Sequence, residues 1–209
     1  MERDYKNLGF VLILFIPVTL FAFYKTYFGQ FPDFDESIDF YIHLHTLFAS
    51  VWLGMLIVQP LLIRYRRPGL HRKIGKASYI VFPLVIISLI PQIIKIYNQG
   101  DDLLLTFSNI TLLVLFYVLA IVNKKNVAKH MRYMIAVSLV FVQPTVARIM
   151  IFWFQSSFIP TIHITFIIVN LILLGLLLWD RVNNRTYQPY LIALGSFVSY
   201  HFVFFIYYL

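Results

Sequence analysis

The sequence predicts an all-α integral membrane protein built as a bundle of seven transmembrane helices. Of its 209 residues, 60% are apolar and only 12% are charged, whereas a soluble domain carries about 25% charge. The apolar residues gather in runs of about 20, long enough to cross the hydrocarbon core of a bilayer. These runs lack the period-2 alternation of barrel strands, so they are expected to be helices. A soluble globular domain and a disordered chain are excluded.

The seven spans follow one another along the chain with short connections, so consecutive helices are expected to be antiparallel neighbours. The first apolar run is too long for a signal-peptide core and lacks a small-residue cleavage site, which predicts a retained span. Pro68-Gly69 predicts the tight turn between the second and third spans. No repeat or linker divides the chain, so residues 1–209 are expected to form one domain. The predicted spans are 8–28, 39–63, 74–97, 103–122, 131–156, 159–179 and 188–209.

Charge predicts the orientation of these helices. Lys and Arg gather at the N-terminus and in every second connection, and Asp and Glu in two of the three remaining ones, which predicts a cytoplasmic N-terminus and an external C-terminus. We expect a bacterial inner-membrane protein whose net charge of +8 faces anionic membrane lipids rather than nucleic acid. The basic residues are Arg3, Lys6, Arg64, Arg66, Arg67, Arg72, Lys73, Lys76, Lys124, Lys125, Lys129, Arg132, Arg181 and Arg185; the acidic ones are Asp33, Asp35, Glu36, Asp39, Asp101 and Asp102.

Six predicted helices place a polar side chain in the outer half of the membrane. A rise of about 1.5 Å per residue puts these side chains within roughly 6 to 12 Å of the outer surface. Polar groups at such depth are costly and are often functional, so this layer is the first candidate site. Its members are His43, Gln92, Asn109, Arg148, His163 and His201.

Helix periodicity orients two of the histidines on their spans. His43 shares a face with Thr46 and Ser50, and small and polar residues mark packing faces in membranes. We therefore expect His43 to point into the bundle. His45, about 200° further around the helix, is expected among lipid headgroups.

The last two spans carry the other outer histidines. His163 and Asn170 lie seven residues apart and share a face. His201 fits less well, because Gly195 and Ser199 lie on roughly the opposite side of its helix. We expect His163 to be a stronger ligand candidate than His201.

Imidazole in this layer predicts a cofactor, because neutral histidine binds haem iron, zinc and copper. His43 and His163 satisfy the depth condition for two axial ligands of haem b, and His43, His163 and His201 suffice for three protein ligands to zinc or copper. The alternative is that these histidines are hydrogen-bonded polar residues that specify helix packing. The absence of cysteine excludes disulfides and thiolate metal sites.

Arg148 is the only permanently charged residue well inside a predicted span, and no acidic residue lies within any predicted span apart from Asp39 at the first position of the second. An unpaired arginine at that depth costs at least about 2.5–3.5 kcal/mol. Three partners remain open: an aspartate at the outer rim (Asp39, Asp101 or Asp102), a bound anion such as a haem propionate or lipid phosphate, or outer water reached by snorkelling.

A second candidate element lies at the predicted cytoplasmic face, where His71-Arg72-x-x-Gly75 and His130-x-Arg132-x-Met134 begin two spans in basic surroundings. It is either an interfacial rim or a site for an anionic headgroup or cofactor. Together with His43 and Arg148, these motifs resemble an uncharacterised bacterial family of multi-pass membrane proteins that is loosely similar to haem-binding cytochrome b-type proteins. The resemblance covers residues 40–150. It implies a helical bundle with His43, His71, His130 and Arg148 as signature positions, and it implies no activity.

Three classes of function follow from these residues. The first is electron transfer with haem or another metal cofactor in the outer polar layer. The second is a zinc-dependent membrane hydrolase, although the His-x-x-x-His pair of such enzymes is missing from the last span. The third is a transporter or lipid-binding protein, possible as a homodimer, in which prolines inside the spans break helices beside a cavity. Those prolines are Pro17, Pro83, Pro91 and Pro144.

Overall fold

The computed structural model describes residues 3–100 and 102–209. Within these ranges seven helices are long and apolar enough to cross a membrane, which confirms the prediction of a multi-pass, all-helical membrane protein. No strand occurs among the residues described. The chain divides into two compact units, unit 1 (Met1–Leu103) and unit 2 (Leu104–Leu209). The spans are Tyr5–Ala22, Phe40–Arg64, Pro68–Gln99, Leu104–Val122, Val127–Trp153, Phe158–Val182 and Gln188–Tyr207.

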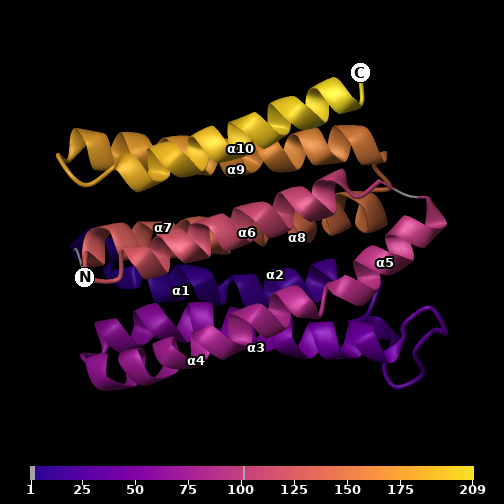
Figure 1. The fold of residues 1–209 in the computed structure, drawn as a ribbon, viewed down its shortest axis with the longest axis horizontal. Coiled ribbons are helices and arrows are strands. Elements are labelled where there is room, and N and C mark those ends of the chain that lie inside the picture. Colours follow the sequence, from indigo (N-terminus) through magenta and orange to yellow (C-terminus); the bar gives the residue numbers. More distant parts are fainter. Residues whose placement is uncertain (1–2, 101) are drawn as a thin grey trace. The chain divides into compact units, whose positions relative to one another are not determined.

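Unit 1 contains the first three spans. Its helices α3 and α4 pack along each other as an antiparallel pair, and α1 packs against α3 (Figure 1). The buried contact at its centre joins the rings of Trp52 and Phe82, whose centroids are 5.1 Å apart. Its elements are a 3-10 turn (Arg3–Asn7), α1 (Leu8–Ile13), α2 (Phe15–Ala22), a second 3-10 turn (Phe28–Gln30), α3 (Phe40–Arg64), α4 (Pro68–Ile87) and α5 (Ile90–Gln99).

Unit 2 contains the last four spans. The pairs α6–α7 and α9–α10 run side by side, and α10 also contacts α6 and α7 (Figure 1). Phe116 of α6 and Phe197 of α10 stack with centroids 5.8 Å apart, and both side chains are fully buried. The elements are α6 (Leu104–Val122), α7 (Val127–Val140), α8 (Val142–Arg148), a π-helical turn (Ile149–Trp153), α9 (Phe158–Val182) and α10 (Gln188–Tyr207).

Three of the four prolines predicted to break helices do so, each by the same mechanism. A proline has no N–H for the carbonyl four residues earlier, and its ring clashes with that carbonyl. The carbonyls concerned are those four residues before Pro17, Pro91 and Pro144. Accordingly α1 ends at Ile13, α4 at Ile87 and α7 at Val140. Pro83 differs, because α4 continues through it.

Local capping sets the helix starts near the predicted boundaries. Asp39 accepts a hydrogen bond from the backbone N–H of Ile42 (3.0 Å) and begins α3, as expected of an N-cap aspartate. The prediction that Pro68-Gly69 forms the turn before the third span is wrong, because Pro68 is already helical. Proline is favoured at the first helical position, where its missing N–H has no intrahelical partner. The turn lies two residues before Pro68, at Arg66, whose φ is 55°.

In each unit the loops rich in Lys and Arg lie at one end of the helices, here called the basic end. The opposite end is called the acidic end after the Asp and Glu residues of unit 1; in unit 2 that end carries no Asp or Glu. In unit 1 the side chain of Arg64 contacts Lys6 and Asn7, so the N-terminal turn and the loop after α3 share the basic end. The side of the membrane that each end faces, and the single domain expected over residues 1–209, stay predictions.

Candidate functional site

The clearest polar constellation in unit 2 is a pair of histidines near the acidic end of α9 and α10. His163 lies in the second turn of α9, and His201 lies in the last two turns of the antiparallel helix α10. Nδ1 of His163 and Nε2 of His201 are 2.9 Å apart, the separation of a hydrogen bond. Both residues are half-buried. The structure thus brings together two predicted ligand residues from different helices.

Aromatic rings hold this pair, here called the histidine pair, on two sides. The ring of Phe166 stacks on His201 with 4.9 Å between centroids and 6° between planes. Phe204 meets His163 edge-on at 5.2 Å and 78°. Phe166 and Phe204 are each 1% exposed, so both imidazoles have fixed walls and defined orientations.

The hydrogen bond fixes what the pair can do chemically. One imidazole nitrogen must donate and the other must accept, so at least one of the two rings is neutral. A neutral imidazole nitrogen is a ligand for zinc, copper and iron. Two ligands of one tetrahedral ion are about 3.3 Å apart, given metal–nitrogen bonds of about 2.0–2.1 Å. The two nitrogens therefore need to separate by only a few tenths of an ångström to hold an ion between them.

The prediction that His201 is the weaker candidate rested on the small residues of α10. Their hydroxyl groups bond within their own helix: Ser196 donates to the carbonyl of Ile192 (2.9 Å) and Ser199 to that of Gly195 (2.8 Å). A serine satisfied in this way needs no neighbouring helix. The positions of these serines therefore do not indicate which face of α10 is packed. The face that packs against α9 is the one that carries His201.

Further polar atoms in unit 2 lack hydrogen-bond partners. The side-chain oxygens of Asn109 on α6, Asn170 on α9 and Thr161 on α9 are buried and make no hydrogen bond in the structure. Buried polar atoms of this kind are costly in a membrane. Asn170 lies two turns from His163 on the same helix face, as predicted from the spacing.

His43 lies in unit 1, in the first turn of α3. Its Nδ1 is 2.7 Å from the hydroxyl of Tyr27, and the ring of Phe34 meets it edge-on at 4.6 Å. One ring nitrogen of His43 is thereby anchored, as in histidines that bind a metal through the other nitrogen. Tyr27 and Phe34 precede the helix in sequence, and no spacing rule connects them to His43.

The contrast predicted between His43 and His45 is wrong. His45 is half-buried like His43, and its Nδ1 is 2.9 Å from Oγ of Ser88 at the junction of α4 and α5. α3 has neighbours on two sides, the segment after α2 on one and α4 on the other. Both faces are therefore packed, and His45 is not a headgroup residue.

Gln92, a predicted cofactor contact, lies in the kink between α4 and α5. Its side-chain amide lies beside the carbonyl oxygens of Ser88 and Leu89 and donates to them when its nitrogen faces them. These carbonyls belong to the turn broken by Pro91. The geometry fits a residue that supplies hydrogen bonds to backbone carbonyls left without partners at the kink.

Arg148 ends α8 and is half-buried. One of its guanidinium nitrogens donates to the carbonyl of Pro144 at 3.4 Å, and a π-helical turn follows at Ile149. Such turns are rare and recur at functional sites. Of its predicted acidic partners, Asp101 lies outside the described residues and Asp39 caps α3. An anionic partner for Arg148 stays a prediction.

A charged pair that the sequence analysis missed lies near the basic end of unit 2. Arg132 of α7 and Asp180 of α9 are both 0% exposed, and Nε of Arg132 is 2.5 Å from Oδ2 of Asp180. The ring of Tyr190 lies 6.0 Å from the guanidinium. The prediction that the spans hold no acidic residue beyond their first position is wrong, because α9 continues to Val182, past the predicted end at residue 179. Of the two alternatives for the motif that contains Arg132, the interfacial rim does not fit this residue, because it is fully buried.

The other residues of the predicted cytoplasmic motif divide by burial. His71 and His130 are half-buried, whereas Arg72 is exposed. Nδ1 of His130 is 2.8 Å from the carbonyl of Ala120, and Nδ1 of His71 is 3.4 Å from that of Gln59. Each ring is therefore tied to the preceding helix.

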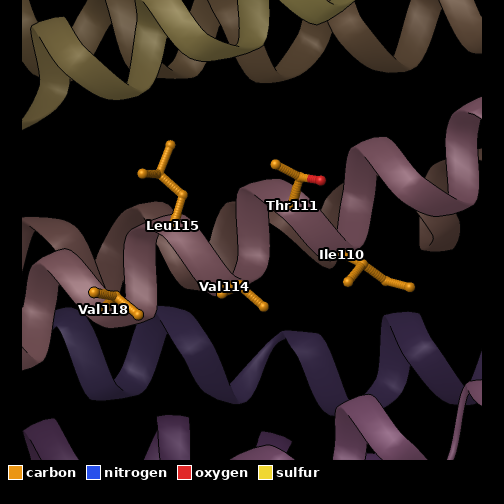
Figure 2. A pocket seen from close by; sticks show the side chains of 5 residues that line it. All are labelled: Ile110, Thr111, Val114, Leu115 and Val118. Carbon is orange, nitrogen blue, oxygen red and sulfur yellow. The ribbon is translucent and has the colours of Figure 1, made fainter.

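Larger metal centres are not apparent in the described part of the chain. In residues 3–100 and 102–209, no group of three or more His, Cys, Asp or Glu side chains is placed to hold a metal ion. Because His43 belongs to unit 1, a centre that combines it with the histidine pair stays a prediction. A shallow hollow on α6 is apolar apart from one hydroxyl, and offers no ligand set (Figure 2). Its lining is Ile110, Thr111, Val114, Leu115 and Val118.

Comparison with known proteins finds no matching family, no matching curated protein and no matching solved structure.

Proposed function

We propose that this multi-pass membrane protein binds a transition-metal cofactor, copper or zinc, through the histidine pair. The observation that carries the proposal is the 2.9 Å separation of His163 Nδ1 and His201 Nε2. It is close to the bite of two imidazoles on one ion, and the ion would replace the shared proton.

The surroundings of the pair favour binding over simple packing. Phe166 and Phe204 set both ring orientations, so little side-chain freedom is lost when an ion binds. Both imidazoles are half-buried, which leaves room for further ligands such as water or a substrate group. Within unit 2, Arg148 is the residue that we propose as the partner of an anionic ligand.

The identity of the ion decides between two activities. Copper would supply one-electron chemistry for electron transfer, and zinc would supply a Lewis acid for hydrolysis. We favour electron transfer, because no carboxylate in the described part of unit 2 lies beside the pair as a general base; Asp180 is committed to Arg132.

A haem b site is the second candidate, supported by the Nδ1 contact of His43 to Tyr27, which presents Nε2 as an axial ligand. The histidine pair does not suit the two axial positions of one haem. Axial nitrogens lie about 4 Å apart on opposite faces of the porphyrin, twice a metal–nitrogen bond, and α9 and α10 pack directly against each other.

The experiment is a metal titration of the full-length protein in detergent. After removal of bound metal, zinc and copper are titrated separately into the wild type, His163→Ala, His201→Ala and the matched control His45→Ala. We expect one ion per chain in the wild type and the control, and affinity weaker by at least about tenfold in either pair variant. A visible spectrum before and after reduction tests the haem candidate in the same samples.

Two results would overturn the metal proposal. One is a wild-type protein that retains its helical circular dichroism and binds neither ion. The other is binding that His163→Ala and His45→Ala weaken equally. A Soret band that His43→Ala abolishes would establish the haem candidate instead.

A further inference from the structure

A hollow at the basic end of unit 1 gathers three cationic side chains. It is lined by Lys6 of the N-terminal turn and by four consecutive residues at the end of α3, namely Ile63, Arg64, Tyr65 and Arg66. Among the side chains that the structure describes, those of residues 5–100 and 102–209, no carboxylate belongs to this lining. Three like charges in one hollow repel one another, so the arrangement favours an anion between them.

Arg64 is held in place by three contacts. Its Nη1 donates to the carbonyl of Lys6 at 3.1 Å and to the side-chain oxygen of Asn7 at 2.5 Å. Its guanidinium carbon lies 4.9 Å from the ring centroid of Phe10, within range of a cation–π contact. The guanidinium is therefore fixed at the hollow.

The close approach of the two segments that form the hollow depends on a glycine. A Cβ added to Gly9 would lie 2.5 Å from the side chain of Leu61 and 3.2 Å from its backbone nitrogen. Gly9 therefore allows α1 to lie directly on α3, which brings Lys6 to Arg64.

Arg66 occupies a backbone conformation that does not favour arginine. Its φ of 55° is left-handed, where a Cβ is sterically unfavourable and where glycine is the usual residue. Strained residues of this kind cluster at ligand sites. Because this backbone conformation favours glycine, we infer that the arginine side chain is the reason for the residue at this position.

We propose that this hollow binds the phosphate of an anionic membrane lipid, such as phosphatidylglycerol. Arginine forks and lysine ammonium groups are the side chains that bind phosphate oxygens. The hollow lies where the spanning helix Phe40–Arg64 ends, at the level expected for headgroups, and Tyr65 is 63% exposed, as is typical of interfacial aromatics. A soluble phosphate has the same charged oxygens, but its binding would not require a site at the end of a membrane-spanning helix.

The test compares lipid binding by the full chain in nanodiscs of phosphatidylcholine and of phosphatidylcholine mixed with phosphatidylglycerol. The informative variant is Arg66→Gly, which removes a guanidinium and suits the left-handed backbone. Lys6→Gln is a second lining variant, and Lys73→Gln is the control, since Lys73 is exposed on α4 outside the lining. Bound phosphatidylglycerol is counted by native mass spectrometry, and thermal midpoints are recorded in both lipids.

We expect Arg66→Gly to weaken phosphatidylglycerol binding by about fivefold, the effect of one interfacial basic residue. Its midpoint in phosphatidylcholine should equal or exceed that of the wild type, so the loss cannot be assigned to misfolding. Lys6→Gln should weaken binding similarly, and Lys73→Gln should leave it unchanged.

The proposal is overturned if Arg66→Gly and Lys6→Gln bind the lipid as the wild type does, or if Lys73→Gln weakens binding equally. A parallel titration with inorganic phosphate distinguishes the two sources of the anion. If inorganic phosphate competes at the lipid's own affinity, the site is for a soluble anion and the lipid proposal fails.

Discussion

Two polar pairs cross between helices of unit 2, and they differ in exposure and charge. The histidine pair joins α9 to α10 near the acidic end, through two half-buried rings that share a hydrogen bond. Arg132 and Asp180 join α7 to α9 near the basic end, and both are 0% exposed. A sealed ion pair cannot exchange its partners without unfolding, whereas a half-buried imidazole pair can exchange a proton for another ligand. We infer that the first pair is the site and the second holds the helices together.

The largest expected effect comes from Asp180→Ala, which leaves the Arg132 guanidinium buried without its carboxylate. Such a change costs about 3–5 kcal/mol of the free energy of unfolding. The double variant Arg132→Met with Asp180→Leu should recover most of that loss, because an apolar pair of similar volume avoids burying charge. Denaturant unfolding in detergent micelles measures both. Equal losses in the single and double variants would contradict the ion-pair account.

His163→Ala sharpens the comparison from the other side. Interhelical hydrogen bonds in membranes average about 0.6 kcal/mol and reach about 1.7, so the unfolding free energy should fall far less than in Asp180→Ala. Metal affinity should fall by at least about tenfold. Parallel unfolding and metal titrations check this split, and a stability loss as large as that of Asp180→Ala would make the histidine pair structural.

Phe166→Leu tests whether the aromatic wall orients His201. Aromatic pairs contribute about 0.5–1.5 kcal/mol beyond their buried area, and we expect a metal-affinity loss of about that size. The exposed Phe202→Leu, one residue from His201 on α10, is the matched control. If both variants bind metal as the wild type does, the stacked ring contributes nothing to the site.

These outcomes show where sequence alone sufficed. The spans followed from the length of the apolar runs, and three kinks followed from prolines that lack an N–H. Counting residues along antiparallel helices placed His163 and His201 in the same half of the bundle, but at depths that differ by roughly 6 Å, and so did not predict their contact. To predict their contact, one must also know which face of α10 points toward α9. The serines of α10 do not indicate that face, because they hydrogen-bond within their own helix.

Asp180 was missed for a different reason. The predicted span ended one residue before it, so it was excluded from the membrane. The negative charge of Asp180 could have identified it, because it is an acidic residue at the basic end and departs from the charge pattern of the loops. An acid in that position at the depth of Arg132 predicts a pair.

The smallest expected effect concerns an exposed polar contact, which completes the comparison. Backbone N–H donation from Ser37 (2.9 Å) lowers the pKa of the Asp35 carboxyl below its ordinary value. A carboxyl group whose pKa is lower in the folded state stabilises the fold at pH values above its pKa in the unfolded chain. That stabilisation is lost as the pH falls through its pKa in the folded protein. Because Asp35 is fully exposed, Asp35→Asn should leave the unfolding midpoint at neutral pH almost unchanged. A carboxyl-carbon NMR titration below about pH 5 checks the direction, and a raised pKa would contradict it.

The most direct test of the central claim is X-ray absorption at the zinc or copper edge of the metal-loaded protein in detergent. We predict two imidazole ligands at about 2.0–2.1 Å, with the imidazole scattering reduced in both His163→Ala and His201→Ala and retained in His45→Ala. Oxygen-only coordination, or an identical spectrum in all three variants, would contradict the assignment of the histidine pair as the metal site.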